Sequence, residues 1–284
     1  MYIEGPAAAV VQASYYDDLD AALTTDPVER KWFFFKEEGF DNERYLANRK
    51  DILENFRVKR NSYPARGEQI VRIAEANVDG KIMDVRNMII DQISRAEKTI
   101  YMEQLFFYDK YINDALMKRK LQNPNLNIKV IVDHNGNFGM NGLPNTIFLK
   151  ELIKYGIEIR ARRTIGITTV LRNGEKRSYH QENHRKITTI DGKYMMVGSS
   201  NYNPDTLQGS FREFGAEVYD LREIQKFESY FLTDWFDKQK TAVVDMESLQ
   251  LNVLGKQLSV EASALLNDIA AQLLRSKDQL ENRH

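Results

Sequence analysis

Apolar and polar positions alternate along the middle of the chain with two periods, one typical of helices and one typical of strands. Apolar residues spaced three or four apart indicate a helix with one buried face, and short apolar runs between turn residues indicate buried strands. In chain order these patterns predict a helix from Asp84 to Ala96, a strand KTIYMEQLFF, a helix from Asp109 to Leu121, a strand IKVIVDH, a helix LPNTIFLKELIKYG and a strand IEIRAR. This alternation predicts an α/β fold with a mostly parallel, mixed sheet flanked by helices.

Two turn signals interrupt the alternation further along the chain. Asn173-Gly174 and Asp191-Gly192 are both strong hairpin turns. The second would join the short strands RKITTI and KYMMVGSS, and a strand FGAEVYD follows. The helix LREIQKFESYFLTDWFDKQ carries its aromatic residues on one face, which is typical of core packing.

The two ends of the chain are less regular. Residues 7–16, 17–24 and 259–280 have helical patterns, and a strand is expected near QIVRIAEANV. We therefore expect three parts: an N-terminal helical or irregular segment over residues 1–70, a catalytic α/β domain over 71–240, and a helical tail over 241–284.

Composition is that of an ordinary globular protein, with 42% apolar, 11% aromatic and 29% charged residues. The net charge of −1 argues against a surface that is basic throughout, as a general nucleic-acid binder would have. The segment from Arg160 to Lys193, however, contains nine lysines and arginines and only three acidic residues. A local site for an anionic substrate and a solvated hairpin face explain this bias equally well.

The chain has no cysteine, which excludes disulfides, thiolate metal sites and cysteine nucleophiles. Its first residues lack the basic region of a signal peptide, and acids interrupt the apolar stretch before it could span a membrane. Neither feature identifies a compartment, although the absence of cysteine is compatible with a periplasmic or secreted protein.

The segment with candidate chemistry begins at His184. His184 and Lys186 would lie on the same side of a strand, which places an imidazole and an ammonium at one site. A neutral imidazole can attack phosphorus, and lysine can stabilise the phosphoryl oxygens, so the pair suits a phosphodiester and requires no metal or other cofactor. The hairpin at Asp191-Gly192 would bring Ser199 and Asn201 back beside the pair.

Other residues are candidates for supporting roles. Glu213 could accept a hydrogen bond from the His184 imidazole and fix its tautomer. Asp191 is a catalytic candidate, although opening an Asp-Gly turn is itself a sufficient reason for an aspartate. Glu103, Gln104 and Arg185 are candidates for substrate binding; Glu103 and Gln104 could instead bond only neighbouring backbone.

The pattern HxKxxxxD from His184 to Asp191, followed by Gly198-Ser-Ser-Asn201, resembles the signature of the phospholipase D superfamily. The resemblance covers roughly residues 70–238 and includes the order of elements that leads to the second motif in two-motif members. It implies a phospholipase D-like half fold and a phosphodiesterase or phosphatidyltransferase that acts through a phosphohistidine intermediate.

One departure from the family pattern is important, because family sites pair two such motifs and this chain has one. The second motif could come from a homodimer mate, as in single-motif nucleases, or from an N-terminal half. The opening MYIEGPAAAVVQ resembles the segment after the first motif of two-motif members, which favours a missing upstream half. The expected substrate is a phospholipid or another phosphodiester, with nucleic acid less favoured. The alternatives are a homodimeric single-motif nuclease and a non-catalytic binding half of a larger complex.

Overall fold

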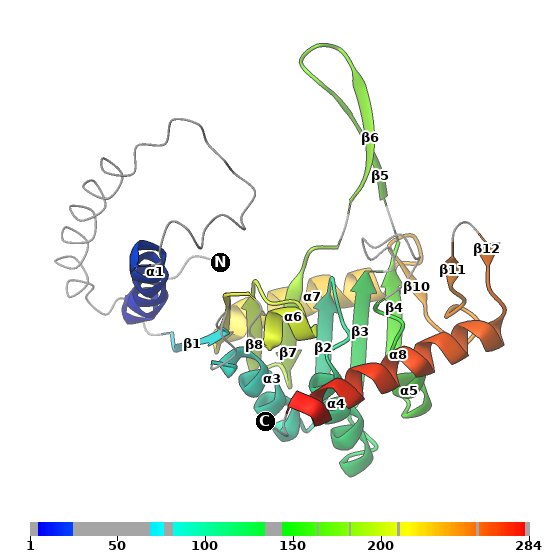
Figure 1. Ribbon diagram of the computed structural model, residues 1–284, viewed down its shortest axis with the longest axis horizontal. Helices are drawn as coiled ribbons and strands as arrows, with labels where there is room; N and C mark the ends of the chain where they lie inside the picture. Colours follow the sequence, from blue (N-terminus) through cyan, green and yellow to red (C-terminus); the bar gives the residue numbers. More distant parts are fainter. Residues whose placement is uncertain are drawn as a thin grey trace. The chain divides into compact units, whose positions relative to one another are not determined.

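The computed structural model describes residues 5–24, 69–76, 82–133, 144–163, 165–181, 183–208, 211–253 and 256–281. The chain divides into two compact units, Met1–Ile73 and Ala74–His284. In chain order the elements are α1 (Pro6–Thr24), β1 (Val71–Ala76), α3 (Asp84–Arg95), β2 (Thr99–Gln104), α4 (Lys110–Gln122), β3 (Asn127–Asp133), α5 (Leu149–Lys154), β4 (Glu158–Arg162), β5 (Ile165–Val170), β6 (Lys176–Gln181), β7 (Lys186–Ile190), β8 (Tyr194–Gly198), α6 (Pro204–Leu207), β9 (Glu213–Val218), α7 (Leu221–Phe236), β10 (Thr241–Val243), β11 (Asn252–Val253), β12 (Lys256–Gln257) and α8 (Val260–Glu281) (Figure 1).

In the first unit, α1 joins the two helical patterns expected at residues 7–16 and 17–24 into one helix. Gly5 precedes this helix with a φ of 91°, a left-handed conformation that glycine adopts without steric cost. Pro6 then occupies the first helical position, where its missing N–H would have no partner in any case.

The main sheet has eight described strands in the order β1-β9-β8-β7-β2-β3-β4-β10, and apart from the first three residues of β1 its strands belong to the second unit. β2, β3 and β4 are parallel to one another. β7 pairs antiparallel with β2, and β8 and β9 continue the antiparallel pairing on that side. The expectation of an α/β fold with a mixed sheet is confirmed, but the parallel strands are not the majority. The chain reaches β7 from a hairpin rather than from a crossover helix, and it therefore returns in the opposite direction.

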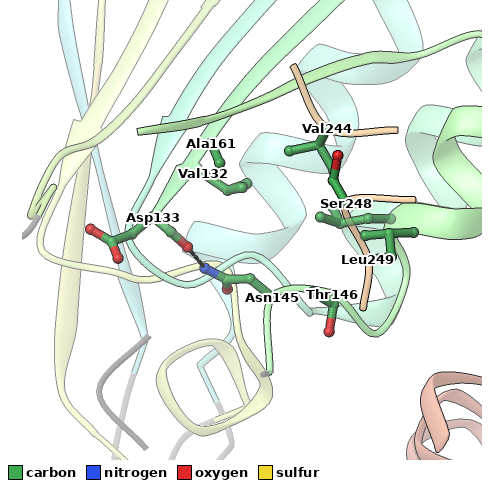
Figure 2. A pocket seen from close by; sticks show the side chains of 9 residues that line it. Val132, Asp133, Asn145, Thr146, Ala161, Val244, Ser248 and Leu249 are labelled. Carbon is green, nitrogen blue, oxygen red and sulfur yellow. Dashed lines mark hydrogen bonds between the residues drawn. The ribbon is translucent and has the colours of Figure 1, made fainter. Parts of the chain in front are cut away.

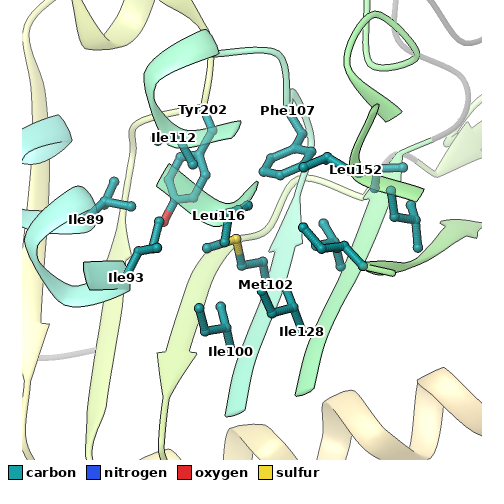
Figure 3. Close-up of a cluster of buried hydrophobic side chains, with 14 of the residues drawn as sticks. Ile89, Ile93, Ile100, Met102, Phe107, Ile112, Leu116, Ile128, Leu152 and Tyr202 are labelled. Atoms are coloured by element: carbon teal, nitrogen blue, oxygen red, sulfur yellow. The ribbon is translucent and has the colours of Figure 1, made fainter. Parts of the chain in front are cut away.

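Helices cover both faces of the sheet (Figure 1). α7 packs on one face, where the Phe231 ring stacks on Tyr101 of β2 at a centroid distance of 5.2 Å. On the other face, apolar residues of α3 and α4 meet those of β2 and β3 in the main hydrophobic core (Figure 3). Ile89, Met102 and Leu116 are among the core residues with no more than 1% of their surface exposed.

Some elements differ from the sequence prediction. α5 covers only Leu149–Lys154 of the predicted helix, because residues 144–148 before it form turns. β10 was not predicted, and it pairs with β4 at the edge of the main sheet, so residues beyond 240 contribute to that sheet. None of the helices within the described residues combines the length and the apolar character needed to cross a membrane.

Candidate functional site

All the predicted site residues except Asp191 lie at one edge of the sheet, because strand direction brings five strand ends together there. β2 and β3 are parallel and end at this edge, and β7, antiparallel to β2, begins at it. β8 ends there and β9 begins there, since each is antiparallel to its neighbour. The residues around Lys186, Gly198 and Glu213 are therefore neighbours although the sequence separates them.

The segment just before β7 is fixed to the ends of two other strands. The Asn183 amide donates to the Asp133 carboxylate at 2.7 Å, and the Leu105 amide donates to the Arg185 carbonyl at 3.2 Å. The sequence suggested that His184 would lie within the strand that carries Lys186. β7 begins only at Lys186, however, so His184 lies two residues before the strand. The His184 side chain is exposed.

Lys186 is only 7% exposed, and its ammonium donates to the His184 carbonyl at 3.1 Å. Directly across the β2–β7 ladder from it lies Gln104, and paired residues of this kind project from the same face of a sheet. Gln104 is completely buried, and neither atom of its amide has a hydrogen-bond partner within the described structure. A buried amide without partners is rare in folded proteins and is found preferentially where a ligand or water completes the bonding.

Ser199 and Glu213 are bonded to each other across the β8–β9 pair. The Ser199 hydroxyl donates to the Glu213 carboxylate and accepts from the Phe214 amide at 3.1 Å. Glu213 is thus engaged by the serine, whereas the sequence suggested that it would hold the imidazole. Gly198 is needed for this close approach, since a Cβ there would lie 2.2 Å from the Phe214 carbonyl oxygen.

The residues after Ser199 leave two further polar atoms buried. The Ser200 hydroxyl and the Asn201 side-chain oxygen have no hydrogen-bond partner within the described residues. One main-chain and one side-chain bond hold this loop in place: the Tyr202 amide donates to the Phe106 carbonyl at 3.0 Å, and the hydroxyls of Tyr202 and Thr188 of β7 bond each other at 2.7 Å. Burial raises the pKa of Tyr202, so its hydroxyl remains protonated.

On the opposite face of the sheet, Glu103 and Arg185 belong to a saturated charge network. The completely buried Glu103 carboxylate accepts from Arg162 and from Arg185, the latter at 2.8 Å. Arg162 also donates to Asp234 of α7 at 2.7 Å, and Lys240 donates to the other Asp234 oxygen at 2.6 Å. Glu103 and Arg185, which the sequence suggested for substrate binding, are thus engaged with other side chains of this network, and their role toward substrate stays a prediction.

Electrostatics in the network favours the charged forms. Burial alone would raise the pKa of Asp234, but hydrogen bonds from Lys240 and Arg162 outweigh it and hold the pKa below its ordinary value. Burial would lower the pKa of Arg162, yet the attraction of Glu103 and the bond to Asp234 keep it above the ordinary arginine value. Both shifts favour the ionised pair of Arg162 and Asp234.

Asp191 lies at the far end of β7 from Lys186 and has a different role. Its carboxylate accepts from the amides of Glu97, Lys98 and Thr99 at 2.8, 2.7 and 2.9 Å, and so binds the start of β2. Its φ of 55° is the left-handed conformation that an Asp-Gly turn uses. At a rise of about 3.3 Å per residue, four residues separate it from the rest of the site by more than 10 Å. These bonds are structural, and we assign the residue no chemical step.

Asn145 is a structural residue of this edge that the sequence did not reveal. Its amide donates to the carbonyls of Leu105 and Asp133, both at 2.7 Å, and its oxygen accepts from the Phe107 amide at 2.8 Å. It thereby joins the ends of β2 and β3, next to a small cavity with a largely apolar lining (Figure 2). None of the predicted site residues lines this cavity.

The network partners were also missed, although one signal was available. Asp234 is a charged residue on the buried face of α7, between Phe231 and Trp235. A lone acid on an apolar helix face requires a cationic partner, and that requirement could have indicated the network. Arg162, 72 residues away in the sequence, could not have been chosen from local patterns.

Comparison with known proteins gives relatives of low sequence identity. A cardiolipin synthase of Listeria welshimeri is 21% identical over 233 residues, which is 82% of this chain and 39% of that protein. A phospholipase D of Rickettsia prowazekii is 26% identical over 155 residues, 54% of this chain and 62% of that protein. The chain thus spans about two fifths of the length of the cardiolipin synthases that it matches.

Solved structures give the same kind of neighbour. A phospholipase D family member, Nuc, from Salmonella typhimurium has a TM-score of 0.47 and 17% identity, covering 62% of this chain and 99% of Nuc. The phosphatidylserine synthase of Haemophilus influenzae has a TM-score of 0.47 and 15% identity, covering 81% of this chain and 53% of that chain. The family model described as cardiolipin synthase, PLD-like domain, matches residues 89–235, more than half of the chain, and the protein therefore belongs to this branch of the phospholipase D superfamily.

Proposed function

We infer that the chain contributes one histidine to a phospholipase D-like active site that cleaves phosphodiesters and transfers phosphatidyl groups. The observation that carries this inference is the pairing of an exposed His184 with a buried Lys186 at the edge where five strand ends meet. Around them lie buried polar atoms of Gln104, Ser200 and Asn201 that have no partner within the described residues. Of these atoms, the Gln104 amide nitrogen and the Ser200 hydroxyl are donors that can bond an anionic group, whereas the Asn201 oxygen is an acceptor.

The chemistry divides into two displacements at phosphorus. In the first, a nitrogen of the neutral His184 imidazole attacks phosphorus, the bond to the leaving alcohol breaks, and a phosphohistidine forms. In the second, water or an acceptor alcohol attacks phosphorus, and the P–N bond breaks to restore the imidazole. Lys186 and the polar side chains nearby would stabilise the phosphoryl oxygens as charge shifts onto them.

A second histidine is needed for the protons. The leaving alkoxide takes a proton from a general acid, and the same group, now a base, removes a proton from the acceptor. We propose that this group belongs to another phospholipase D-like half, in an upstream segment of a longer protein or in a second chain. With the roles exchanged, His184 would be the acid and the other histidine the nucleophile.

The substrate we propose is a phospholipid, with a phosphatidyl group as the part transferred. Support comes from the family model and from the cardiolipin synthases among the relatives, whose names describe synthesis of a phospholipid. Phosphatidylglycerol is the natural test substrate, because transfer of its phosphatidyl group to a second molecule gives cardiolipin, and transfer to water gives phosphatidic acid.

The test assays the full chain on phosphatidylglycerol, with a plasmid DNA cleavage assay alongside and light scattering for mass. We expect cardiolipin or phosphatidic acid from a species in which two halves are paired, loss of product in His184→Ala, and normal product in His180→Ala. DNA cleavage by a dimer that depends on His184 would instead establish the homodimeric nuclease. A dimer that is inert on both substrates would favour the non-catalytic binding half and contradict the proposal.

A further inference from the structure

The hairpin formed by β5 and β6 is a described part of the second unit that the proposed chemistry does not use. Its strands pair antiparallel from Ile165–Gln181 to Val170–Lys176 and form a two-stranded sheet of their own (Figure 1). With six residues per strand at about 3.3 Å each, the hairpin is on the order of 20 Å long. An isolated hairpin of this kind is marginally stable, so an outside partner would stabilise it.

The turn at the tip has a defined geometry. Gly174 adopts a φ of 83°, and its amide donates to the Leu171 carbonyl at 2.8 Å. The Asn173 side chain accepts from the Glu175 amide at 3.0 Å and donates to the Glu175 carboxylate at 3.4 Å. The tip therefore has an ordered turn, and its one acidic residue, Glu175, is hydrogen-bonded to Asn173 of that turn.

The tip combines exposed apolar and basic side chains. Val170 is 65% exposed and Leu171 is half-buried. Arg172 and Lys176 are exposed on either side of the turn. Aliphatic residues flanked by lysine and arginine are the composition of segments that bind the surface of a membrane, where apolar groups enter the acyl boundary and cations meet the headgroups.

The hairpin is also covalently close to the candidate site. β5 begins at Ile165, shortly after β4 ends at Arg162, and β6 ends at Gln181, three residues before His184. A surface that binds the tip would thus be held near the chain that carries the imidazole. For an enzyme with a lipid substrate, this is the arrangement that raises the local concentration of substrate.

We propose that the β5–β6 tip, residues Val170–Lys176, is a docking element for the surface of an anionic phospholipid bilayer. The proposal rests on the proposed function, in which the substrate is a phospholipid. It adds that the protein reaches this substrate by binding the bilayer through the tip. A nucleic acid is the weaker alternative, because its phosphate backbone would use Arg172 and Lys176 but would leave Val170 without an apolar partner. The net charge of −1 makes the local basic tip, and not the whole surface, the source of attraction.

A second exposed apolar surface provides the matched control. α8 carries Leu273, which is 64% exposed, close to the 65% of Val170. The cation near it, Arg275, is paired with Glu151 and Asp114, and the same helix also carries the acids Glu261 and Asp268. If exposed apolar area alone caused binding, α8 would bind a membrane as well as the hairpin does.

The experiment uses the absence of cysteine, which allows one labelling site per variant. Val170→Cys and Leu273→Cys are each labelled with an environment-sensitive dye and mixed with vesicles of phosphatidylcholine, with or without one third phosphatidylglycerol. We expect a blue shift at position 170 with anionic vesicles only, and none at position 273. A shift at position 273 alone, a shift at position 170 with single-stranded DNA but not with vesicles, or no shift at all would overturn the proposal.

Charge variants give the size of the effect. Each basic side chain near an anionic surface contributes about fivefold to partitioning, so Arg172→Gln with Lys176→Gln should weaken binding roughly 25-fold. Vesicle binding should persist in His184→Ala, and the double variant should still release p-nitrophenol from a soluble phosphodiester. Intact vesicle binding with no such release would contradict the proposed function alone, whereas release without vesicle binding would contradict the docking element alone.

Discussion

The two faces of the chain at the start of β7 differ in how their polar groups are bonded. On one face, Arg185 pairs with Glu103, and Arg162 bridges Glu103 and Asp234 through short ion pairs. On the other face, Gln104 is buried without a hydrogen-bond partner within the described residues, beside Lys186 and the exposed His184. Successive side chains of this short segment point to opposite faces. On one face the polar groups have all their bonding partners, and on the other face some buried polar groups have none within the described residues.

This difference indicates that neighbouring residues have different roles: Arg185 stabilises the fold, and His184 and Lys186 serve the proposed reaction. A buried carboxylate such as Glu103 is tolerated only when cations compensate its charge, and here the compensation also anchors Arg185. With Arg185 held against one face, His184 and Lys186 are left to the other, where a phosphoryl group would complete the unpaired bonds. The comparison therefore predicts different losses from substitutions that are only one or two residues apart.

The largest effect is expected from removal of the imidazole. His184→Asn should lower the rate of phosphodiester cleavage on the order of 10³-fold or more, because it removes a group that acts only in the reaction. The side chain is exposed, so the free energy of unfolding should change by less than about 0.5 kcal/mol. Kinetics and urea unfolding of the same preparation check both values. Retained activity would remove His184 from the chemistry.

The next effect is on stability and comes from the saturated face. Glu103→Gln leaves Arg162 and Arg185 without their buried anion and should lower the free energy of unfolding by about 3–5 kcal/mol. The matched control is Glu158→Gln, which removes a carboxylate that pairs with Lys129 but is 56% exposed. That change should cost less than about 1 kcal/mol. If both variants lost the same free energy of unfolding in urea, the buried network would stabilise the fold no more than an exposed ion pair does.

Asp191 sharpens the comparison along the same strand. Asp191→Ala removes the acceptor of three amides at the start of β2, and should lower the free energy of unfolding by about 2 kcal/mol. The rate constant of the folded variant should stay within about twofold of the original, since the carboxylate is distant from Lys186. A large loss of rate in a fully folded variant would restore a chemical role to Asp191.

The smallest effect is the pH dependence of the charge network. The pKa of Asp234 is lowered in the folded chain, so its contribution is fully present above the unfolded pKa and is lost as pH falls through the folded value. Unfolding followed between about pH 6 and pH 3 should therefore show a steeper loss of stability in the original chain than in Asp234→Asn. Parallel curves would show that Asp234 is not ionised in a stabilising pair.

Much of the fold followed from local patterns, because periodicity and turn chemistry are local properties. The helices α3, α4, α7 and α8 and the turns at Gly174 and Gly192 lie where the sequence predicted them. Strand direction did not follow, since a run such as RKITTI has the same pattern in either direction. The parallel majority was expected from alternating helices and strands, but β7 enters from a hairpin.

The site was predictable as a neighbourhood but not as a set of bonds. The motif spacing brought His184, Lys186, Ser199 and Glu213 to one edge, as the hairpin at Gly192 requires. The hydrogen-bond partner of Glu213 depends on distances between side chains, which the spacing of the motif in the sequence does not determine. In the structure the partner is Ser199. Asp234 gave a local signal as a lone acid on an apolar helix face, but its partner Arg162, 72 residues away, was not predictable from any local pattern.

The central claim, that His184 acts on a phosphodiester, is tested most directly for its role as nucleophile, which does not require the other half. A p-nitrophenyl phosphodiester has a leaving group that needs no proton, so the missing general acid is not required. We predict a burst of p-nitrophenol equal to the amount of protein, with the added mass located on the His184 peptide by mass spectrometry. A burst that persists in His184→Asn, or an adduct on any other residue, would contradict the account.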